Sequence, residues 1–248
     1  MKKLLFTLAL LVGFLSSCGD EEVILDPDTI GTAYYPLEVG TYTIFNVKET
    51  VYSENEGVTS LFQVREAINE FYKDQAGKEW FRIEISRRDS EEGAWRVIGV
   101  KTVSKTMLGK STGNLLIQEN NKAVVNMVYP VAEGKTWNPN AFNTAYYPNQ
   151  EDTNLREEFV YQSVGKSFEK DGQTFSNTVT ILKSEVNTSL EVLEQSEVFS
   201  FNQGPVYRYF KQLEYCSDSS GETCPYLEDY IVTGTERIET FESSGKID

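Results

Sequence analysis

The stretch Trp80-Phe81-Arg82-Ile83-Glu84-Ile85-Ser86-Arg87 (residues 80–87) decides the fold, because apolar and polar residues alternate along it. Successive side chains of a β-strand point to opposite faces, so Phe81, Ile83 and Ile85 share one face. The polar residue that follows each of them lies on the other face. One apolar and one polar face are typical of a strand in an antiparallel sheet with a core on one side and water on the other.

Similar segments recur from residue 34 onward, rich in Val, Ile, Thr, Tyr and Phe and separated by Gly, Asn and Asp clusters. Asn120-Asn121 and Asp171-Gly172 predict hairpin turns, because these residues tolerate positive φ. Residues 61–73 also fit helical spacing, but the turn formers at 74–78 favour a strand that pairs with 80–87. The expected strands are 41–52, 61–73, 80–87, 95–104, 115–119, 123–129, 157–168, 174–184, 197–201, 206–216 and 226–241.

These segments predict an all-β fold, namely a curved antiparallel meander or an open, incomplete β-barrel with little helix. A chain with 40% hydrophobic residues can fill the core of one β domain, which we place at 34–248. Residues 35–40 and 129–134 share the pattern Tyr-Pro-aliphatic-x-x-Gly. The repeat indicates either two similar halves, 34–128 and 129–248, or two recurring entries from a loop into a strand.

The first eighteen residues resemble a bacterial lipoprotein signal. Met1-Lys2-Lys3 is basic, residues 4–15 are apolar, and Ser17 precedes Cys18. As a helix, the apolar run would span roughly 18 Å against a hydrocarbon core of about 30 Å, so it is a removable signal and not a membrane span. The resemblance implies a signal peptide at 1–17 and a lipidated Cys18 carrying acyl chains such as palmitate. An ordinary secretory signal is the alternative.

Residues 18–33 are acidic and contain Pro and Gly, which predicts a tether. Asp20-Glu21-Glu22 resembles the acidic signal that exports Bacteroidota lipoproteins to the outer face of the outer membrane, and a solvated linker is the alternative. Asp28-Thr29-Ile30 resembles the O-glycosylation pattern of that phylum, with Thr29 as acceptor, although any Asp-Thr-aliphatic triplet matches. We therefore expect a lipid-anchored outer-membrane protein, exposed at the cell surface.

The mature chain is strongly acidic. Without Lys2 and Lys3, 21 Lys and Arg residues face 38 Asp and Glu residues, which leaves a net charge of −17. Such a charge argues against nucleic acid as a partner and against adsorption on an anionic leaflet. The lipid anchor must then provide the membrane attachment. A glycan, a lipid or an envelope protein remains as the expected partner.

Once Cys18 is assigned to the lipid, Cys216 and Cys224 remain as an even pair in an oxidising compartment. The residues between them are polar turn formers, so a disulfide would join the two sides of a hairpin tip. Free thiols in a redox or metal role are the alternative, but the chain has no histidine and this spacing is not that of a redox motif.

Together these features resemble a family of Bacteroidota lipoproteins. The resemblance is carried by the Tyr-Tyr-Pro-Leu-x-x-Gly opening at 34–40, the Tyr-Pro-Val motif at 129–131, the stretch 172–181 and the late element Gly204-Pro205-Val206-Tyr207-Arg208. Relatives commonly have Gly-Val-Gly in that last element, and this chain departs from it. The resemblance implies a curved sheet or open barrel with no established activity. From the residues themselves we expect no cofactor and no metal.

The absence of histidine excludes a Ser-His-Asp or Cys-His nucleophile and the usual zinc sites. Ser163 with Lys166 and Ser243 with Lys246 match Ser-x-x-Lys, a pattern too short to indicate catalysis. A pair of carboxylates for glycoside hydrolysis stays open, because two acids about 5 to 9.5 Å apart would suffice. With 38 acidic residues, however, the sequence singles out no pair.

Residues 137–149 are the candidate ligand-binding segment, because aromatic and amide residues interleave there. Aromatic rings stack on sugar rings, and amides bond their hydroxyls. A connecting loop whose aromatics pack back on the sheet is the alternative. The candidate residues are Trp137, Asn140, Phe142, Asn143, Tyr146 and Tyr147.

The sequence favours a non-enzymatic envelope lipoprotein that binds a ligand or acts as a scaffold on the outer membrane. A carrier or sensor that holds an apolar ligand in an open barrel is a second hypothesis, and it predicts a cavity lined by Phe and Tyr. A glycoside hydrolase without histidine is the third, and it requires two carboxylates that face each other across a cleft.

Overall fold

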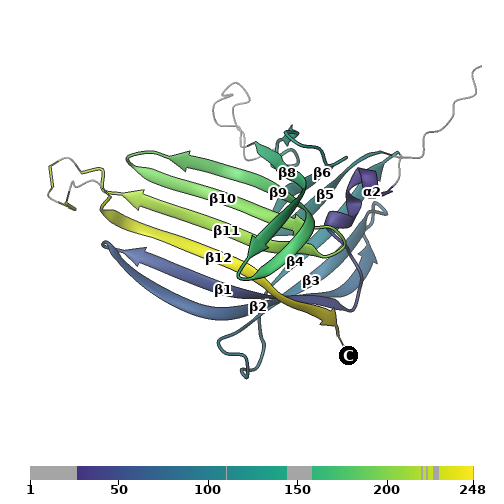
Figure 1. The fold of residues 1–248 in the computed structure, drawn as a ribbon, viewed down its shortest axis with the longest axis horizontal. Helices are drawn as coiled ribbons and strands as arrows, with labels where there is room; N and C mark the ends of the chain where they lie inside the picture. Colours follow the sequence, from purple (N-terminus) through teal and green to yellow (C-terminus); the bar gives the residue numbers. More distant parts are fainter. Residues whose placement is uncertain are drawn as a thin grey trace, which may run out of the picture.

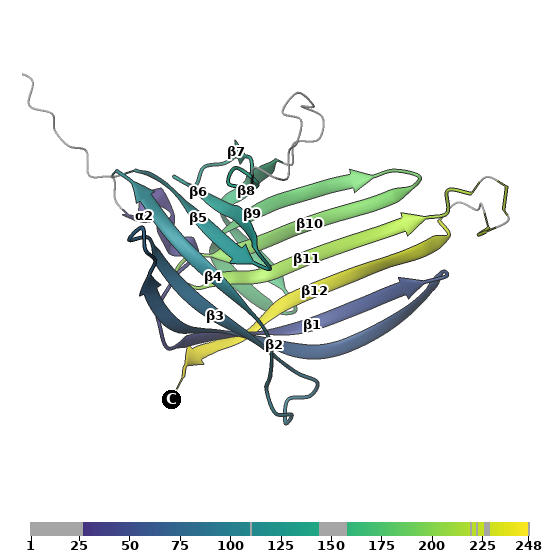
Figure 2. The same ribbon diagram turned by 180° about the vertical axis from the view of Figure 1, so that it is seen from behind.

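A computed structural model describes residues 27–109, 111–143, 158–218, 220–221, 223–225 and 229–247. Its strands form one antiparallel sheet in the order β6-β5-β4-β3-β2-β1-β12-β11-β10-β9-β8-β7. The sheet curls until it nearly closes into a barrel (Figures 1 and 2). The strands are β1 (Thr41–Ser53), β2 (Glu56–Lys73), β3 (Glu79–Arg88), β4 (Arg96–Leu108), β5 (Thr112–Glu119), β6 (Lys122–Tyr129), β7 (Thr136–Trp137), β8 (Phe159–Lys170), β9 (Gln173–Asn187), β10 (Glu191–Ser200), β11 (Gly204–Tyr215) and β12 (Ile231–Lys246). The predicted all-β fold is confirmed.

The centre of the sheet is the pair formed by the first and last long strands. β1 lies antiparallel to β12, with Thr41 opposite Lys246 and Ser53 opposite Thr233. Strands β2 to β6 follow on one side of this pair and β11 to β7 on the other, each next to its neighbour in sequence. The ambiguous segment 61–73 belongs to β2, which pairs with β3 as expected.

The two Tyr-Pro motifs share part of their local structure, although the Tyr129-Pro130 bond is cis and the Tyr35-Pro36 bond is not. Tyr35 and Tyr129 are both buried, and Gly40 and Gly134 both have positive φ, at 88° and 73°. Each glycine N–H donates to a strand carbonyl: Gly40 to Ile68 and Gly134 to Tyr161. Glycine adopts positive φ without the steric penalty of a side chain, which explains its place in both motifs.

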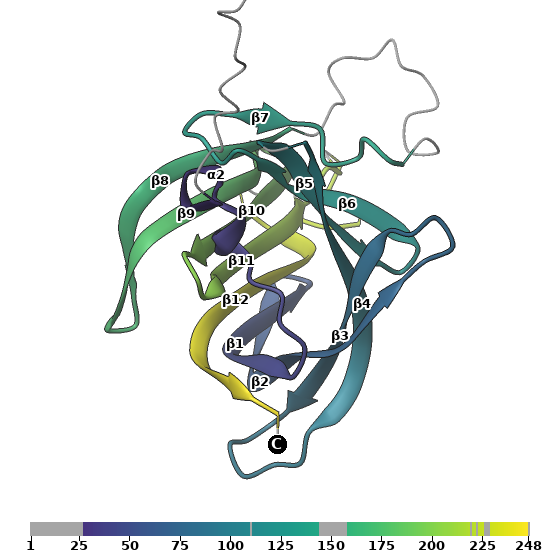
Figure 3. The ribbon, with the colours of Figure 1, turned by 90° about the vertical axis from the view of Figure 1, so that its right-hand side faces the viewer.

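The N-terminal segment is packed inside one end of the barrel. It contains the short helix α2 (Pro27–Ile30) and the 3-10 turn η1 (Thr32–Tyr34). Figure 3 shows α2 within the ring of strands. Ile30, Tyr34 and Tyr35 join the largest apolar cluster, which draws residues from β2 to β10. The packed structure therefore includes 27–33, the last part of the segment predicted as a tether.

The barrel has one seam, between β6 and the chain around β7 and β8, where the described residues form no backbone ladder. Side chains bridge it instead. The Tyr161 hydroxyl donates to the carbonyl of Val128 and accepts from its N–H, both at 3.0 Å. The Trp137 indole N–H donates to the Val125 carbonyl at 2.8 Å. Each contact satisfies backbone groups that a neighbouring strand would otherwise pair.

An asparagine completes the seam beyond β7. The Asn143 side chain donates to the carbonyl of Ala123 at 2.6 Å and accepts from its N–H at 3.3 Å. The Pro139 carbonyl accepts from the Val125 N–H at 2.8 Å. Because an amide side chain carries one donor and one acceptor face, Asn143 substitutes for a residue of a paired strand.

Replacing Tyr161 by phenylalanine should lower the free energy of unfolding by about 1 to 3 kcal/mol, because Val128 then has an unpaired N–H and carbonyl in a buried seam. Urea unfolding measures the loss, and amide hydrogen exchange should accelerate at Val128. Tyr52→Phe is the matched control, since the Tyr52 hydroxyl has no hydrogen-bond partner among the described residues. Equal stability of the two variants would contradict the bridging role of Tyr161.

Candidate functional site

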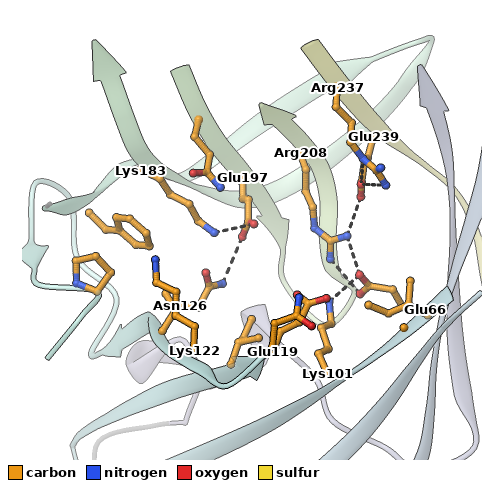
Figure 4. Close-up of a pocket in the computed structure, with 18 of the residues that line it drawn as sticks. Glu66, Lys101, Glu119, Lys122, Asn126, Lys183, Glu197, Arg208, Arg237 and Glu239 are labelled. Atoms are coloured by element: carbon orange, nitrogen blue, oxygen red, sulfur yellow. Dashed lines mark hydrogen bonds and ion pairs between the residues drawn. The ribbon is translucent and has the colours of Figure 1, made fainter. Parts of the chain in front are cut away.

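A central cavity of about 720 Å³ lies inside the barrel. Its lining comes from both walls, with residues of β2, β4 and β6 facing residues of β9 to β12 (Figure 4). Glu119, Asn120 and Lys122, at the turn from β5 to β6, belong to the lining and are exposed. The cavity therefore reaches solvent beside this turn.

A chain of ion pairs crosses the floor of the central cavity. Glu66 on β2 contacts Lys101 Nζ on β4 at 2.6 Å and Arg208 Nη1 on β11 at 2.8 Å. Arg208 Nη2 donates to the second Glu66 oxygen at 3.0 Å, so this pair is bidentate. Glu66 and Arg208 lie on strands separated by β1 and β12, and the buried Phe45 of β1 lies beneath the guanidinium at 4.7 Å.

The register of the strands extends this series of ion pairs to β12 and β1. Arg208 lies opposite Glu239 in the β11–β12 pair, and its Nη1 contacts Glu239 Oε2 at 2.8 Å. Arg237 contacts the other oxygen of Glu239 at 2.7 Å and Glu49 of β1 at 3.0 Å. Opposite charges that face each other across neighbouring strands stabilise the sheet, and here they point into the lumen.

A second charged group joins β9, β10 and β6. Lys183 Nζ contacts Glu197 Oε1 at 2.7 Å, and the Asn126 side chain donates to the other oxygen of Glu197 at 3.3 Å. Lys183 also lies 5.3 Å from the ring centroid of Phe159. Because Asn126 and Glu197 come from opposite sides of the seam, this contact spans the cavity (Figure 4).

The ion pairs hold the cavity carboxylates in their charged form. Burial alone would raise the pKa of Glu66, but the charges and hydrogen bonds of Arg208 and Lys101 outweigh it and lower that pKa to about 2. Burial also opposes ionisation of Glu197, whose pKa Lys183 and Arg208 nevertheless lower. For Lys101, burial alone would lower the pKa, but the charge of Glu66, the hydrogen bond to it and the interaction with Tyr35 together raise the pKa. Glu66 and Glu197 are therefore both ionised at neutral pH.

Acidification should destabilise the protein through Glu66. Its pKa is about 2 when folded and 4.5 in the absence of the fold, so the unfolded chain binds the proton first as the pH falls. The free energy of unfolding should then fall between pH 4.5 and about 2, with a contribution of roughly 3 kcal/mol from this group. Urea titrations at several pH values measure the slope.

Glu66→Gln should be less stable than the parent at pH 7 and should lose less stability on acidification. The difference between the two slopes isolates Glu66 from the other carboxylates. Identical slopes would contradict the lowered pKa.

A second cavity of about 320 Å³ lies near the start of β1 and the end of β12. Tyr35 and Glu66 line both cavities, so these two side chains stand between them. Tyr35 follows η1 directly, and its carbonyl accepts a hydrogen bond from Lys105 Nζ at 2.6 Å. Burial lowers the pKa of Lys105 to about 8.

The candidate ligand-binding residues of 137–149 lie at the seam. Trp137 is only 8% exposed, and its indole N–H is bonded to Val125. Asn140 is buried and lines the central cavity, Asn143 bridges to Ala123, and Phe142 is 57% exposed. Their role in binding stays a prediction.

The other residues predicted from the sequence have different outcomes. The disulfide between Cys216 and Cys224 is confirmed. Thr29 is exposed on α2, which leaves the O-glycosylation prediction as it was. Cys18, Tyr146 and Tyr147 lie outside the described residues.

Sequence reasoning did not single out the charged residues of the lumen. One signal was available: Val64, Glu66 and Ile68 occupy every second position of β2, so Glu66 shares the inward face with two apolar residues. A charged residue on the apolar face of a strand was therefore the feature of the sequence that pointed to the cavity.

Comparison of the chain with protein-family models, with curated proteins and with solved structures gives no match. Among the described residues, no helix is both long and apolar enough to cross a membrane. The same residues contain no group of three or more Cys, Asp and Glu side chains arranged to hold a metal ion.

Proposed function

We propose that the protein is a non-enzymatic binding protein of the cell envelope that holds a small polar ligand in the central cavity. The supporting observation is the cavity itself, whose volume of about 720 Å³ lies within the range of roughly 300–1,000 Å³ typical of ligand sites. A pure scaffold would fill this space with side chains. Here the lumen holds side chains fixed by ion pairs on several strands, which suits a preorganised site.

The lining favours a polar ligand over an apolar one. An apolar ligand would cover Lys101, Glu66 and Arg208 without offering hydrogen bonds, and it would remove them from water at a cost. The aromatic residues that a carrier of apolar ligands would need are mostly committed to the core around α2. The hypothesis of an apolar carrier therefore receives less support than that of a polar binder.

The same groups support binding rather than glycoside hydrolysis. A glycosidase needs one carboxyl group that stays protonated to act as a general acid, usually through a raised pKa. In the cavity, the pKa values of Glu66 and Glu197 are lowered, and both carboxylates are held by cations.

The location at the outer membrane is part of the proposal and rests on residues 1–22. Cys18→Ala should move the protein from the membrane fraction to the soluble fraction after cell lysis. Unchanged retention in membranes would count against the lipid anchor, without affecting the proposal that the cavity binds a ligand.

Native mass spectrometry of the full chain, extracted in a mild detergent, tests the binding role. A small molecule that is lost on denaturation is expected. Gly99→Phe provides the specific variant, because Gly99 lines the cavity and a Cβ there would meet only Ile85 Cδ1, at 4.0 Å. This variant should fill the cavity and abolish co-purification.

Val97→Phe is the matched control on the same strand, since Val97 is 60% exposed and lies outside the cavity lining. It should retain the ligand. A bare parent protein that also binds nothing in a screen of sugars, peptides, polyamines and lipids would overturn the proposed function.

A further inference from the structure

The charges at the central cavity balance each other. Four cations and four carboxylates are joined by ion pairs of 3.0 Å or less, although the whole chain carries a net charge of −15. Glu49, in this group, lies outside the lining, and the exposed Glu119 and Lys122 at the mouth of the cavity add one charge of each sign. A charged ligand would be attracted by one member of each pair, repelled by the other, and stripped of its own hydration. An uncharged ligand avoids this repulsion, and removing its hydration costs less than removing that of an ion. The paired residues are Lys101, Lys183, Arg208, Arg237, Glu49, Glu66, Glu197 and Glu239.

The lining still has hydrogen-bonding capacity that the fold does not use. An ammonium group carries three donors, and among the described residues Lys101 and Lys183 each donate only one hydrogen bond or ion pair, to Glu66 and Glu197. The side chains of Ser184 and Gln195 line the cavity with no hydrogen-bond partner in the described part of the chain. Donors and acceptors therefore stand side by side around an electrically neutral space.

Apolar side chains belong to the lining on both walls of the cavity. Ile117 and Val124 come from β5 and β6, and Phe159 and Leu193 come from β8 and β10, near Lys183 and Glu197. Molecules that combine C–H faces with hydroxyl groups match such a lining, because the C–H faces pack on the apolar side chains while the hydroxyls reach the polar groups. A hydroxyl both donates and accepts, so it can bond to either member of an ion pair.

We infer that the ligand is an uncharged polyhydroxylated molecule, a sugar or short oligosaccharide. It lies against the ion pairs of the floor and the apolar side chains of the lining, Phe159 among them, with Ser184 and Gln195 bonding its hydroxyls. This inference rests on the proposed function and assigns the chemical class of its ligand.

Isothermal titration calorimetry of the full chain, after a screen on an array of neutral and acidic oligosaccharides, tests the inference. Dipeptides, inorganic phosphate and spermidine serve as charged probes. A neutral glycan should bind, and its Kd should change by less than about twofold between 50 and 500 mM NaCl, because salt screens attraction between charges only. The binding of a charged ligand would weaken markedly over the same range of NaCl concentration.

Ser184→Ala and Gln195→Leu should each weaken neutral-glycan binding about threefold to tenfold, the usual effect of losing one hydrogen bond. Ser196→Ala is the control on β10, because Ser196 is absent from the cavity lining, and it should leave the Kd unchanged. Neither lining residue belongs to an ion pair, so all three variants should fold, which circular dichroism checks.

Binding of charged probes alone would overturn the inference and leave the proposed function intact. Glycan binding that Gly99→Phe or the two lining variants do not affect would also overturn it. Failure of every probe, together with a bare mass in native mass spectrometry, would overturn the proposed function as well.

Discussion

Replacing Arg208 by methionine should lower the free energy of unfolding by about 3 to 5 kcal/mol, the usual cost of removing one partner from a buried ion pair. Arg208 contacts both oxygens of Glu66 and one oxygen of Glu239, so its loss leaves Glu66 with Lys101 alone and Glu239 with Arg237 alone, and the buried group gains a net negative charge. Methionine keeps much of the length of the side chain, which limits any additional loss of packing. Urea unfolding, followed by tryptophan fluorescence, measures the change.

Lys246→Met is the matched control, because Lys246 pairs with Glu38 at the surface, where both side chains are largely exposed. It should change the stability little. Glu66→Gln added to Arg208→Met should restore part of the loss, since it returns the buried group to equal numbers of cations and carboxylates. A single variant as stable as the parent, or a double variant less stable than Arg208→Met, would contradict the account of the ion pairs.

Trp137→Ala should destabilise the protein about as much as Arg208→Met. The free energy of unfolding should fall by about 3 to 5 kcal/mol, as for other buried tryptophans. The Trp137 ring packs on Tyr161 at 4.5 Å and on Phe159 at 5.9 Å, and its N–H bonds to Val125 across the seam. Removing it opens a void where no strand ladder holds the barrel together. Amide exchange of β6 should accelerate along with the fall in stability, as measured by urea unfolding.

Trp137→Phe separates packing from the hydrogen bond, because phenylalanine retains an aromatic ring but leaves the Val125 carbonyl unpaired. It should lose less stability than Trp137→Ala. If Trp137 served only to contact a ligand, as its neighbourhood in the sequence suggested, Trp137→Ala would leave the unfolding curve unchanged and affect binding alone.

The strands with clear alternation were predictable from the sequence. Segment 80–87 lies within β3, and its inward Ile83 is buried. Segment 61–73 was resolved correctly because the turn formers at 74–78 outweighed its helical spacing. The predicted faces hold only in part. Ser86, which the alternation placed on the water face, is 1% exposed, because the register shifts between Ile85 and Ser86. In β2, residues 62–64 and 66–68 are buried in succession, so both of its faces are covered there.

The outer ends of the long strands were missed for the opposite reason. β2 begins at Glu56 and β10 at Glu191, several residues before the predicted starts. Residues 56–61 are exposed one after another, and most of 191–197 are at least partly accessible. When neither face is buried, no alternation marks the strand. The turn at Glu54 and Asn55, both with positive φ, was not predicted, because the residues around it also show no alternation of apolar and polar side chains.

The charged cavity could not be assembled from the sequence, because its partners are far apart. Glu66 and Arg208 are separated by 142 positions, and only the pairing of β1 with β12 brings their strands close together. Taken singly, each residue fits a solvated strand position. The alternation of inward and outward side chains along β2 indicates that Glu66 points inward. No residue near it in the sequence indicates the Arg208 guanidinium that neutralises its charge.

The β1–β12 pair has a consequence for how the chain acquires its structure. Every other neighbouring pair of strands is adjacent in sequence, whereas this pair joins Thr41 to Lys246. Contacts between distant residues carry the highest entropic cost of loop closure, so they form late and slowly. Two local meanders, 41–129 and 136–246, can assemble first, and the barrel with its cavity arises only when they meet. A nascent chain therefore has no central cavity until its last strand has been synthesised and has paired with the first.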